Sequence, residues 1–269
     1  MTISSTNIAA SKSAAFRGSG KKLPPTLILA GGLGTRLRSA YSAGPKSMAP
    51  VSGRPFLDYL LGWLKSEGVE DVILCVGYMK SHIRKFIGSG RKWGMKVEYS
   101  NERKQLGTGG AVKKAERLIS GSRLLVVNGD TFLNVRLSEL IEFHISQKTL
   151  ATLAAVRVKD AGRYGTLRMD RGRRVTAFLE KVKTTQDNWR AAHGVLINGG
   201  VYVFEKELLK AICIGKTVSL EKEVFPTLLV KKSLSAFETK GFFLDIGVPE
   251  DLRRAQSELP RRISVGHPR

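Results

Sequence analysis

Cysteines, histidines and long apolar runs are all scarce in this sequence. Its 269 residues include two Cys and four His. Two cysteines cannot form a disulfide framework or a Cys-rich metal site, so a reducing compartment, the cytoplasm, is expected. The longest unbroken apolar run covers residues 72–76, whereas a membrane-spanning helix needs roughly 20 apolar residues. An integral membrane protein is therefore excluded, and no membrane partner is expected.

Acidic residues are also scarce, since 23 Asp and Glu face 45 Lys and Arg and the formal net charge is +22. Such a surface attracts phosphate polyanions, among them nucleic acids. The basic residues are spread along the chain, however, and no stretch interleaves them with aromatic residues as a single-strand binding groove does. We therefore expect phosphorylated small molecules as partners, and no nucleic acid.

Residues 1–24 contain no acidic residue and show no hydrophobic periodicity. This composition predicts a disordered leader. A transit peptide is the alternative, because the segment is basic and rich in serine. Residues 25–258 are expected to form one domain, and residues 259–269 a basic tail.

Apolar runs alternate with helical spacings in the first half of that domain. Short apolar runs that break into glycine or polar residues are typical of buried parallel strands. This alternation predicts an α/β fold: a three-layer α/β/α, Rossmann-like open sheet that is mostly parallel. The strands are expected near residues 27–30, 72–76, 97–99 and 124–127, and the helices near residues 57–64, 83–87 and 111–119.

The second half changes character, because strand-like runs there are separated by short polar turns. Such runs predict antiparallel pairing, joined to the same sheet or at its edge. The strands are expected near residues 153–158, 165–169, 175–180 and 200–204, and helices near residues 220–228 and 249–256.

The most informative segment follows the first expected strand, where residues 31–36 read G-G-L-G-T-R. Glycines let backbone N–H groups approach an anion closely, and Arg36 adds a fixed positive charge, so the segment is typical of a phosphate-binding loop. It is not the dinucleotide fingerprint, because Leu37 stands where the third glycine belongs. A tight turn alone would also explain the glycines.

Further motifs carry a resemblance to a known family. The runs A-G-G-x-G-T-R-L at Ala30, P-K-x-M-x-P-V at Pro45 and G-x-P-x-L-x-Y-L at Gly53 resemble the start of the sugar-1-phosphate nucleotidylyltransferases. Within that family the chain looks most like the D-glycero-α-D-manno-heptose 1-phosphate guanylyltransferases. The likeness covers residues 26–257 and continues, in the family's order, through residues 106–111, 128–130, 164–165, 180–181, 198–202 and 243–249.

Three positions depart from the family pattern. Ser47 stands where a second proline is common, and Val248 where threonine is frequent. Gln105 stands where many heptose-type relatives have proline. Because Gln105 lies near the expected base pocket, it bears on the choice of guanine.

The resemblance implies a nucleotide-diphospho-sugar transferase fold and transfer of a nucleoside monophosphate from an NTP, GTP here, to D-glycero-α-D-manno-heptose 1-phosphate. The NDP-sugar would serve glycan, lipopolysaccharide or capsule biosynthesis. A mannose-1-phosphate guanylyltransferase and a glucose-1-phosphate uridylyl- or thymidylyltransferase are the alternatives. Residues 25–130 would form the nucleotide-binding half and residues 131–258 the sugar-phosphate-binding half. A homo-oligomer is compatible with this assignment.

Positive charge is what this reaction needs most. The attacking sugar phosphate oxygen is already an anion, so no general base is required, but two polyanions must be held together. By the resemblance, Arg36 holds the β- and γ-phosphates, Lys46 reaches the α-phosphate or the sugar phosphate, and Lys181 binds the sugar phosphate. Each of these side chains taken alone would more often be a solvated surface residue.

Two aspartates predict a metal site. Asp130 follows a buried apolar strand, and Asp245 lies in a second apolar run far downstream. Ligands in open α/β sheets lie at the carboxyl ends of strands, and paired carboxylates suit Mg²⁺. The resemblance gives both residues this role, with Asp130 also catalytic. A helix N-cap at Asp130 and a turn carboxylate at Asp245 are the alternatives.

The resemblance also assigns residues to the base and the sugar. Gln105 and residues 107–110 match a base-reading segment, with a helix N-terminus capped by Thr108 as the alternative. Glu180 can accept two sugar hydroxyls, or it forms a surface salt bridge with Lys181. The nucleotide-binding set is Ala30, Gly31, Gly32, Gly34, Thr35, Gln105, Gly107, Thr108, Gly109 and Gly110, and the sugar-phosphate set is Tyr164, Gly165, Glu180, Lys181 and Asn198.

A nucleotide-sensing regulatory pseudoenzyme is a second class to consider. Such relatives often lose some of the charged residues that chemistry requires. The complete set, Arg36, Lys46, Asp130, Lys181 and Asp245, argues for an enzyme.

Overall fold

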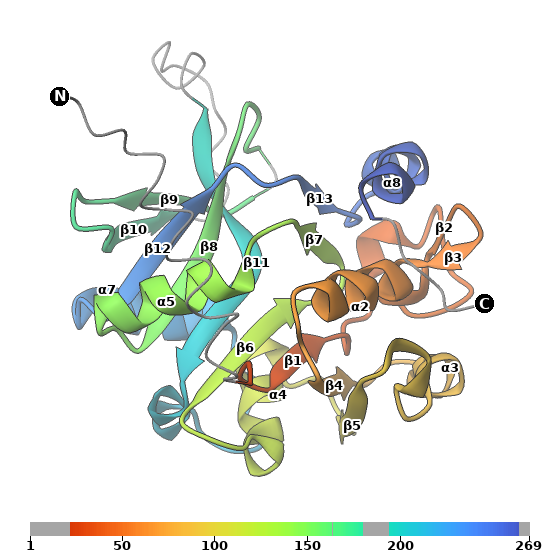
Figure 1. Cartoon of the computed structure of the whole chain (residues 1–269), viewed down its shortest axis with the longest axis horizontal. Coiled ribbons are helices and arrows are strands. Elements are labelled where there is room, and N and C mark those ends of the chain that lie inside the picture. The colour runs from red at the N-terminus through yellow and green to blue at the C-terminus, as the bar shows by residue number, and fades with distance from the viewer. Residues whose placement is uncertain (1–21, 163, 180–193, 264–269) are drawn as a thin grey trace, which may run out of the picture.

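The computed structural model describes residues 22–162, 164–179 and 194–263 (Figure 1). The predictions for Glu180 and Lys181, and for most of the leader, lie outside these residues. Lys22 and Leu23, which end the predicted leader, contact the domain: the Lys22 ammonium pairs with Asp71 at 2.8 Å, and Leu23 packs against the core.

The predicted parallel sheet is confirmed in the first half of the chain. It comprises β1 (Thr26–Leu29), β4 (Asp71–Val76), β5 (Lys96–Asn101) and β6 (Arg123–Asn128), in the order β6-β1-β4-β5. Ile28 on the central β1 pairs with Leu74 on one side and Val127 on the other, and all three are wholly buried. Burial on both faces explains why these strands read as continuous apolar runs.

The predicted antiparallel pairing in the second half is also confirmed. There, β11 (Val195–Glu205) runs antiparallel to β6, β8 and β9, while β12 lies parallel to β8. Nine of the described strands join in this one sheet. The remaining bounds are β8 (Ala151–Val158), β9 (Thr166–Met169), β10 (Val175–Leu179) and β12 (Leu234–Thr239).

Helices cover both faces of the sheet, as Figure 1 shows for α2 and α5 in front and α4 behind. None of the helices in the described part of the chain is long and apolar enough to cross a membrane. The helices are α2 (Phe56–Ser66), α3 (Lys80–Ile87), α4 (Gly107–Ala115), α5 (Leu137–Gln147), α7 (Phe225–Val230) and α8 (Pro249–Arg262), with a π-helical turn at Leu220–Val224.

Two hydrophobic clusters lie on opposite faces of the sheet, because successive strand residues point to opposite sides. Ile28 and Val127 belong to the cluster beneath α2 and α5, and Leu27 and Val126 to the cluster beneath α4 and α7. This arrangement confirms the predicted three-layer α/β/α architecture.

A short two-stranded sheet positions the site. In it β7 (Thr131–Leu133) pairs antiparallel with β13 (Phe243–Asp245), and Thr131 lies opposite Asp245. A second small pair, β2 (Pro50–Val51) with β3 (Arg54–Pro55), precedes α2. The β7–β13 pairing joins the end of β6 to a segment near the end of the described chain.

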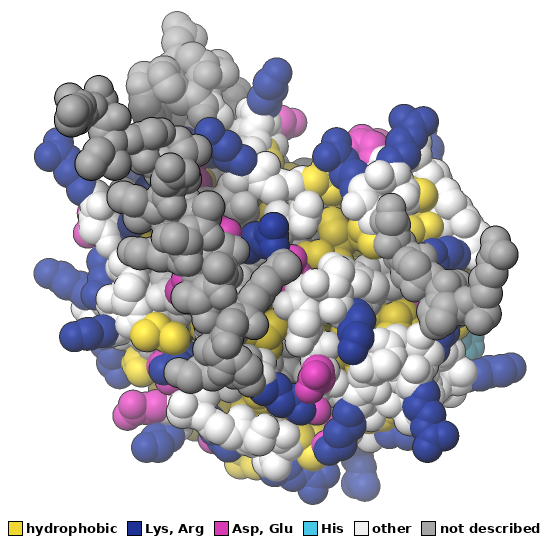
Figure 2. Space-filling model, viewed as in Figure 1, with side chains coloured by type: hydrophobic (Ala, Val, Ile, Leu, Met, Phe, Trp, Pro, Cys, Tyr) yellow, Lys and Arg dark blue, Asp and Glu magenta, His cyan; other side chains and the backbone are white. Residues whose placement is uncertain are grey.

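Lys and Arg side chains are scattered over the face of the molecule seen in Figure 2 and are not gathered into one stripe. A nucleic-acid groove concentrates its basic residues along the path of the backbone. The viewed face therefore has the character of a solvated basic surface.

Candidate active site

A cavity of about 430 Å³ opens at the carboxyl ends of β1 and β6. Ligands bind at this edge of open α/β sheets. The cavity is lined by most of residues 29–36, by Lys46 and Ser47, by parts of residues 102–111, by residues 128–130, and by Thr217 and Gly247. Of the predicted site residues, Ala30, Gly31, Gly32, Gly34, Thr35, Arg36, Lys46, Gln105, Gly107, Thr108 and Asp130 line this cavity, whereas Gly109 and Gly110 do not.

The glycine-rich loop leaves β1 and turns sharply at Gly34, whose φ of 60° is left-handed and favours glycine. A Cβ on Gly34 would also come within 3.0 Å of the Lys46 Cβ. A 3₁₀ turn over Thr35–Leu37 follows, in which Leu37 is buried while Arg36 is exposed at the cavity. The buried leucine thus fixes the turn that presents the arginine.

Lys46 lies between the two predicted metal-binding aspartates. Its Nζ donates to Asp130 Oδ2 at 2.8 Å and to Asp245 Oδ1 at 3.4 Å, and its side chain is only 10% exposed. The residue begins a 3₁₀ turn directly after Pro45. Proline fixes the backbone before the lysine, so the side chain enters the cavity from a rigid base.

The β7–β13 pair brings the aspartates together. Asp130 directly precedes β7, Asp245 ends β13, and the Ile246 amide donates to the Asp130 carbonyl at 3.1 Å. Because a strand follows Asp130, the helix N-cap alternative for this residue is wrong. Asp245 also makes a turn contact, since its Oδ1 accepts from the Gly247 amide at 2.7 Å, and this contact leaves Oδ2 for a metal.

The three charges shift one another's pKa values. Burial alone would lower the pKa of Lys46, but attraction to the two carboxylates outweighs it and raises that pKa. Burial acts to raise the pKa of Asp130, yet the adjacent Lys46 ammonium lowers it overall. Burial and the Asp130 charge raise the pKa of Asp245. One ammonium between two carboxylates leaves the cluster one positive charge short.

Within residues 22–162, 164–179 and 194–263, no group of three or more His, Cys, Asp or Glu could hold a metal ion. Asp130 and Asp245 supply two carboxylates that are short of positive charge. Mg²⁺ typically takes one or two carboxylates and completes its octahedron with waters and substrate phosphates. The donor set therefore fits a magnesium ion that arrives with a nucleotide.

The glycines after Gln105 accommodate the protein's own backbone. A Cβ on Gly107 would lie 2.5 Å from the Val218 carbonyl oxygen. The Gly109 and Gly110 amides donate to that same carbonyl, at 2.9 and 3.2 Å. A Cβ on Gly110 would lie 2.6 Å from the Lys216 carbonyl oxygen, so Gly107 and Gly110 are required by packing against the segment before Leu220.

Thr108 does not cap α4, so the capping alternative is wrong. Its hydroxyl donates to Glu221 Oε2 at 2.9 Å and accepts from the Leu220 amide at 2.8 Å. Gln105 is exposed at the cavity, and its carbonyl accepts from the Thr217 hydroxyl at 3.0 Å. These bonds tie the cavity wall to residues 217–221.

Tyr164, Gly165 and Asn198 do not line this cavity. Tyr164 lines a second cavity of about 470 Å³, where its ring lies edge-on to Phe243 with centroids 5.3 Å apart. The Asn198 side chain is satisfied internally, since its amide donates to the Tyr202 hydroxyl at 2.9 Å and its oxygen accepts from the Gly200 amide at 3.1 Å. These three residues therefore lie outside the lining of the cavity that contains Lys46.

Three buried polar groups at the cavity were not among the predicted site residues. The Ser47 hydroxyl and the Asn128 side-chain oxygen are buried and have no hydrogen-bond partner in the described part of the chain. Glu102 is about nine-tenths buried. Asn128 stands in the same N-G-D motif as Asp130, and Glu102 directly follows β5, so their places at strand ends could have revealed both.

A phosphate-binding loop at the carboxyl edge of a parallel sheet, facing a lysine between two carboxylates, defines an enzyme that handles nucleoside phosphates. The sequence matches the family model described as "Nucleotidyl transferase" over residues 25–262. The chain belongs to the nucleotidyl transferase family.

Individual proteins of this family show which of its members the chain is similar to. The chain is 40% identical to the D-glycero-alpha-D-manno-heptose 1-phosphate guanylyltransferase of Aneurinibacillus thermoaerophilus, over 88% of this chain and 99% of that enzyme. It is 36% identical to the mannose-1-phosphate guanylyltransferase of Mycobacterium tuberculosis, over 88% of this chain and 65% of that enzyme. The crystal structure of HddC from Yersinia pseudotuberculosis complexed with GMP-PN is similar in fold, with a TM-score of 0.75, 34% identity, and coverage of 88% of this chain and 99% of that one.

Proposed function

We propose that the protein transfers a guanylyl group from GTP to D-glycero-α-D-manno-heptose 1-phosphate. The proposal is supported by how much of each related enzyme the chain covers, together with its sequence identity to that enzyme. The chain spans 99% of the heptose 1-phosphate enzyme at 40% identity, but 65% of the mannose 1-phosphate enzyme at 36%. The product is a nucleotide sugar suited to glycan assembly.

The reaction is a displacement at the α-phosphorus. A phosphate oxygen of the sugar 1-phosphate forms a bond to the α-phosphorus of GTP, and the bond from that phosphorus to the α,β-bridging oxygen breaks. Pyrophosphate leaves with the bonding electrons. No proton need be removed from the attacking oxygen, because it is already anionic. Catalysis then rests on positioning and on charge stabilisation.

The cavity supplies both. Arg36 and the amides of residues 31–34 face the β- and γ-phosphates of the leaving pyrophosphate. Lys46 lies close enough to the carboxylates to reach an α-phosphate held beside them. Lys181 is proposed for the sugar phosphate, with Glu180 for sugar hydroxyls. Because Arg36, Lys46 and Asp130 line one cavity and Asp245 contacts Lys46 at its edge, catalysis is favoured over nucleotide sensing alone.

Asp130 and Asp245 would hold Mg²⁺. When bound, the ion would neutralise charge on phosphate oxygens and supply a Lewis acid at the transferring group. Lys46 would then be free to turn from the carboxylates toward the phosphates.

Mannose 1-phosphate is the second candidate acceptor, supported by the 36% identity to the M. tuberculosis enzyme. Its ring shares the hydroxyl configuration of the heptose but lacks one carbon with its hydroxyl. A site that hydrogen-bonds this hydroxyl disfavours mannose by about 1–3 kcal/mol, because its polar groups would be left unpaired. A homo-oligomer remains a prediction.

Pyrophosphate release across a grid of four nucleoside triphosphates and three sugar 1-phosphates tests the proposal. We expect GTP with the heptose 1-phosphate to give the highest kcat/KM, and release to require Mg²⁺. A grid won tenfold by UTP or dTTP with glucose 1-phosphate would refute the guanylyl-heptose assignment and leave nucleotidyl transfer intact.

A further inference from the structure

The charged side chains that line the active-site cavity have no excess of positive charge. Among the described residues they are Arg36, Lys46, Glu102 and Asp130, two of each sign. Asp245 adds a further carboxylate beside Lys46. GTP and a sugar 1-phosphate are both polyanions, so the lining as a whole gives them no net attraction from a distance. Long-range attraction therefore has to come from charges outside the lining.

The cations are spread along the chain, but the acidic residues are not. Residues 23–57, 103–115 and 208–220 contain ten Lys and Arg and no Asp or Glu. These three segments, together with residues 128–130, supply most of the cavity lining. Nearly half of the net charge of +22 thus belongs to the segments that form the cavity wall.

Three of these cations lie at the mouth of the cavity, next to its lining residues. Arg103 and Lys104 lie between the lining residues at positions 102 and 105, and Lys216 directly precedes the lining residue Thr217. The Thr217 hydroxyl donates to the Gln105 carbonyl at 3.0 Å, which brings the two segments together. All three cations are exposed, and their side chains form no ion pair or hydrogen bond within the described residues. We call Arg103, Lys104 and Lys216 the basic rim.

Cations on other elements are offset by carboxylates. On α8, Arg254 pairs with Glu258 at 2.8 Å, and on β8, Arg157 pairs with Glu238 at 2.6 Å. The two charges of an ion pair largely cancel at a distance, whereas an unpaired cation keeps its full charge. The basic rim therefore leaves the mouth of the cavity positive.

We infer that the basic rim is a capture surface, which draws polyanionic substrates from solution to the cavity before they contact the phosphate-binding loop. A cleft whose charges share one sign focuses the field and raises association rates by roughly 10- to 10³-fold. The inference goes beyond the proposed function and rests on it only in that the substrates are phosphate polyanions. The rim acts on the encounter and not on the displacement at phosphorus.

The test measures how fast the protein binds a fluorescent N-methylanthraniloyl derivative of GTP with Mg²⁺ in a stopped-flow instrument, over a range of NaCl concentrations. One variant carries Arg103→Gln, Lys104→Gln and Lys216→Gln together, which removes the three charges of the basic rim and keeps long polar side chains. Saturated turnover and the melting temperature of the same variant are also measured.

A matched control removes three charges elsewhere. Arg168→Gln, Arg171→Gln and Lys231→Gln together change exposed cations of β9, of the turn between β9 and β10, and of the end of α7. The strands β9 and β10 form the end of the sheet opposite β5, and none of the three cations lines the cavity (Figure 1). The control therefore has the same net charge as the rim variant but keeps the positive mouth.

At low salt we expect the rim variant to bind the GTP derivative about fivefold or more slowly than the wild type, and the control within about twofold of it. The Debye length falls from about 30 Å at 0.01 M salt to about 3 Å at 1 M. The difference should therefore shrink to less than about twofold at high salt. The kcat and the melting temperature should match the wild type in both variants.

A rim variant that binds at the wild-type rate in low salt would overturn the inference. An equal slowing of the control would also overturn it, because total charge would then explain the effect. A slowing that salt does not reduce, or a lowered kcat, would overturn it by making the rim residues direct substrate contacts. A wild-type enzyme that prefers another nucleoside triphosphate would overturn the guanylyl assignment alone, and the same rates would be measured with that nucleotide.

Discussion

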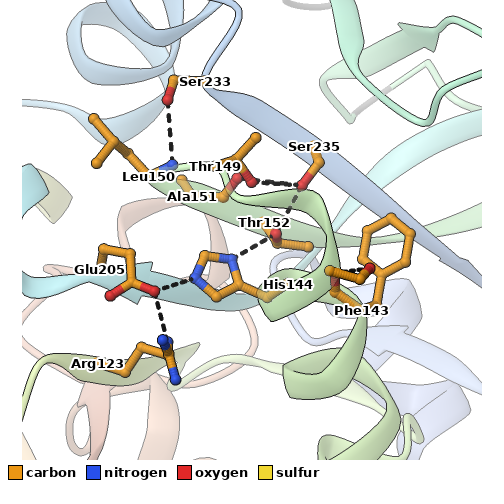
Figure 3. A network of polar contacts seen from close by, with 11 residues as sticks. Arg123, Phe143, His144, Thr149, Leu150, Ala151, Thr152, Glu205, Ser233 and Ser235 are labelled. Atoms are coloured by element: carbon orange, nitrogen blue, oxygen red, sulfur yellow. Dashed lines mark hydrogen bonds and ion pairs between the residues drawn. The ribbon is translucent and has the colours of Figure 1, made fainter.

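The cavity and the buried network around His144 both gather polar side chains inside the molecule, but they satisfy them differently. In the network, His144 Nδ1 lies 2.8 Å from the Thr152 hydroxyl, which lies 2.7 Å from that of Ser235 (Figure 3). At the other end, His144 Nε2 lies 3.3 Å from a Glu205 oxygen that also accepts from Arg123 at 2.6 Å. Each polar group there has a partner.

The partners determine which group donates and which accepts in each hydrogen bond of this network. The Glu205 carboxylate only accepts, so His144 Nε2 carries the proton and Nδ1 accepts from Thr152. Thr152 then accepts from Ser235, and Ser235 from Thr149, 2.9 Å away. A neutral imidazole fits this order, and burial lowers the pKa of His144 despite the nearby Glu205.

In the cavity, by contrast, Ser47 Oγ and Asn128 Oδ1 have no partner within the described residues, and one lysine serves two carboxylates. Buried polar groups are normally satisfied, so those that are not call for an explanation. Thr26 Oγ1 and Trp63 Nε1 are unpartnered elsewhere in the described residues, so it is the combination of unmet hydrogen-bonding capacity with an open cavity that marks a site built for a ligand. Substitutions in the cavity should therefore affect activity, and substitutions in the network stability.

The largest effect is expected at the carboxylate pair. Asp130→Asn and Asp245→Asn should each lower kcat by on the order of 10²-fold or more. Asp245→Asn should keep the wild-type melting temperature, because removing its charge ends the repulsion that raises its pKa. Pyrophosphate release and thermal unfolding check this, and near-wild-type turnover in either folded variant would remove that residue from the metal site.

Thr152→Val should show the reverse pattern. Valine keeps the shape but removes the hydroxyl that joins His144 to Ser235, which should cost about 1–3 kcal/mol of unfolding free energy. Urea unfolding measures that loss, while kcat/KM should stay within about twofold of wild type. Unchanged stability would show that the network is not needed for the fold.

The pH dependence of stability should reveal His144. Its pKa is lowered in the folded state, so its neutral form stabilises the fold above the unfolded pKa near 6.5, and that stability is lost as the pH falls below about 6.5. The expected slope is at most about 1.4 kcal/mol per pH unit. Urea unfolding from pH 7.5 to 5.5 should show this decline, and His144→Leu should flatten it. An equally steep decline in that variant would assign the effect to other groups.

The smallest effect is expected at Ser47. Because its hydroxyl has no partner in the described structure, Ser47→Ala should leave unfolding free energy unchanged within about 0.5 kcal/mol. The KM for the nucleoside triphosphate should rise a few-fold, since the hydroxyl is available to a phosphate. Steady-state kinetics measure the KM, and urea unfolding measures the stability. A clear loss of stability with an unchanged KM would make Ser47 a structural residue.

Most of the fold could be predicted from sequence, because buried parallel strands such as β4 and β6 read as apolar runs. The prediction missed α5, β12 and the short strands β2, β3, β7 and β13. The short β13 carries only three residues, too few for a periodicity to appear. β11 was expected at residues 200–204, yet it begins at Val195, because Gly199 and Gly200 interrupt the apolar pattern where the pairing register shifts.

For the site, motifs located Lys46, Asp130 and Asp245, but only the β7–β13 register shows that they meet. The base contact of residues 107–110 stays a prediction, and the glycines there also pack against residues 216–218. Close packing against a ligand and close packing against a neighbouring backbone both require glycine, so the sequence pattern alone does not distinguish them. The place of Glu102 directly after β5 could have been recognised, whereas its burial could not, because the burial arises from packing against Gly31 and Leu106.

The contrast between the cavity and the His144 network is tested most directly by thermal unfolding of each variant with and without Mg²⁺ and GTP. The quantity compared is the rise in melting temperature that the two ligands cause. A ligand that binds only the folded state stabilises it by an amount that grows with the logarithm of the ligand concentration divided by Kd. We expect the same upward shift in wild type and Thr152→Val, although the latter starts from a lower melting temperature, and little or no shift in Asp245→Asn. A full shift in Asp245→Asn together with a lost shift in Thr152→Val would contradict the assignment of the cavity as the nucleotide site.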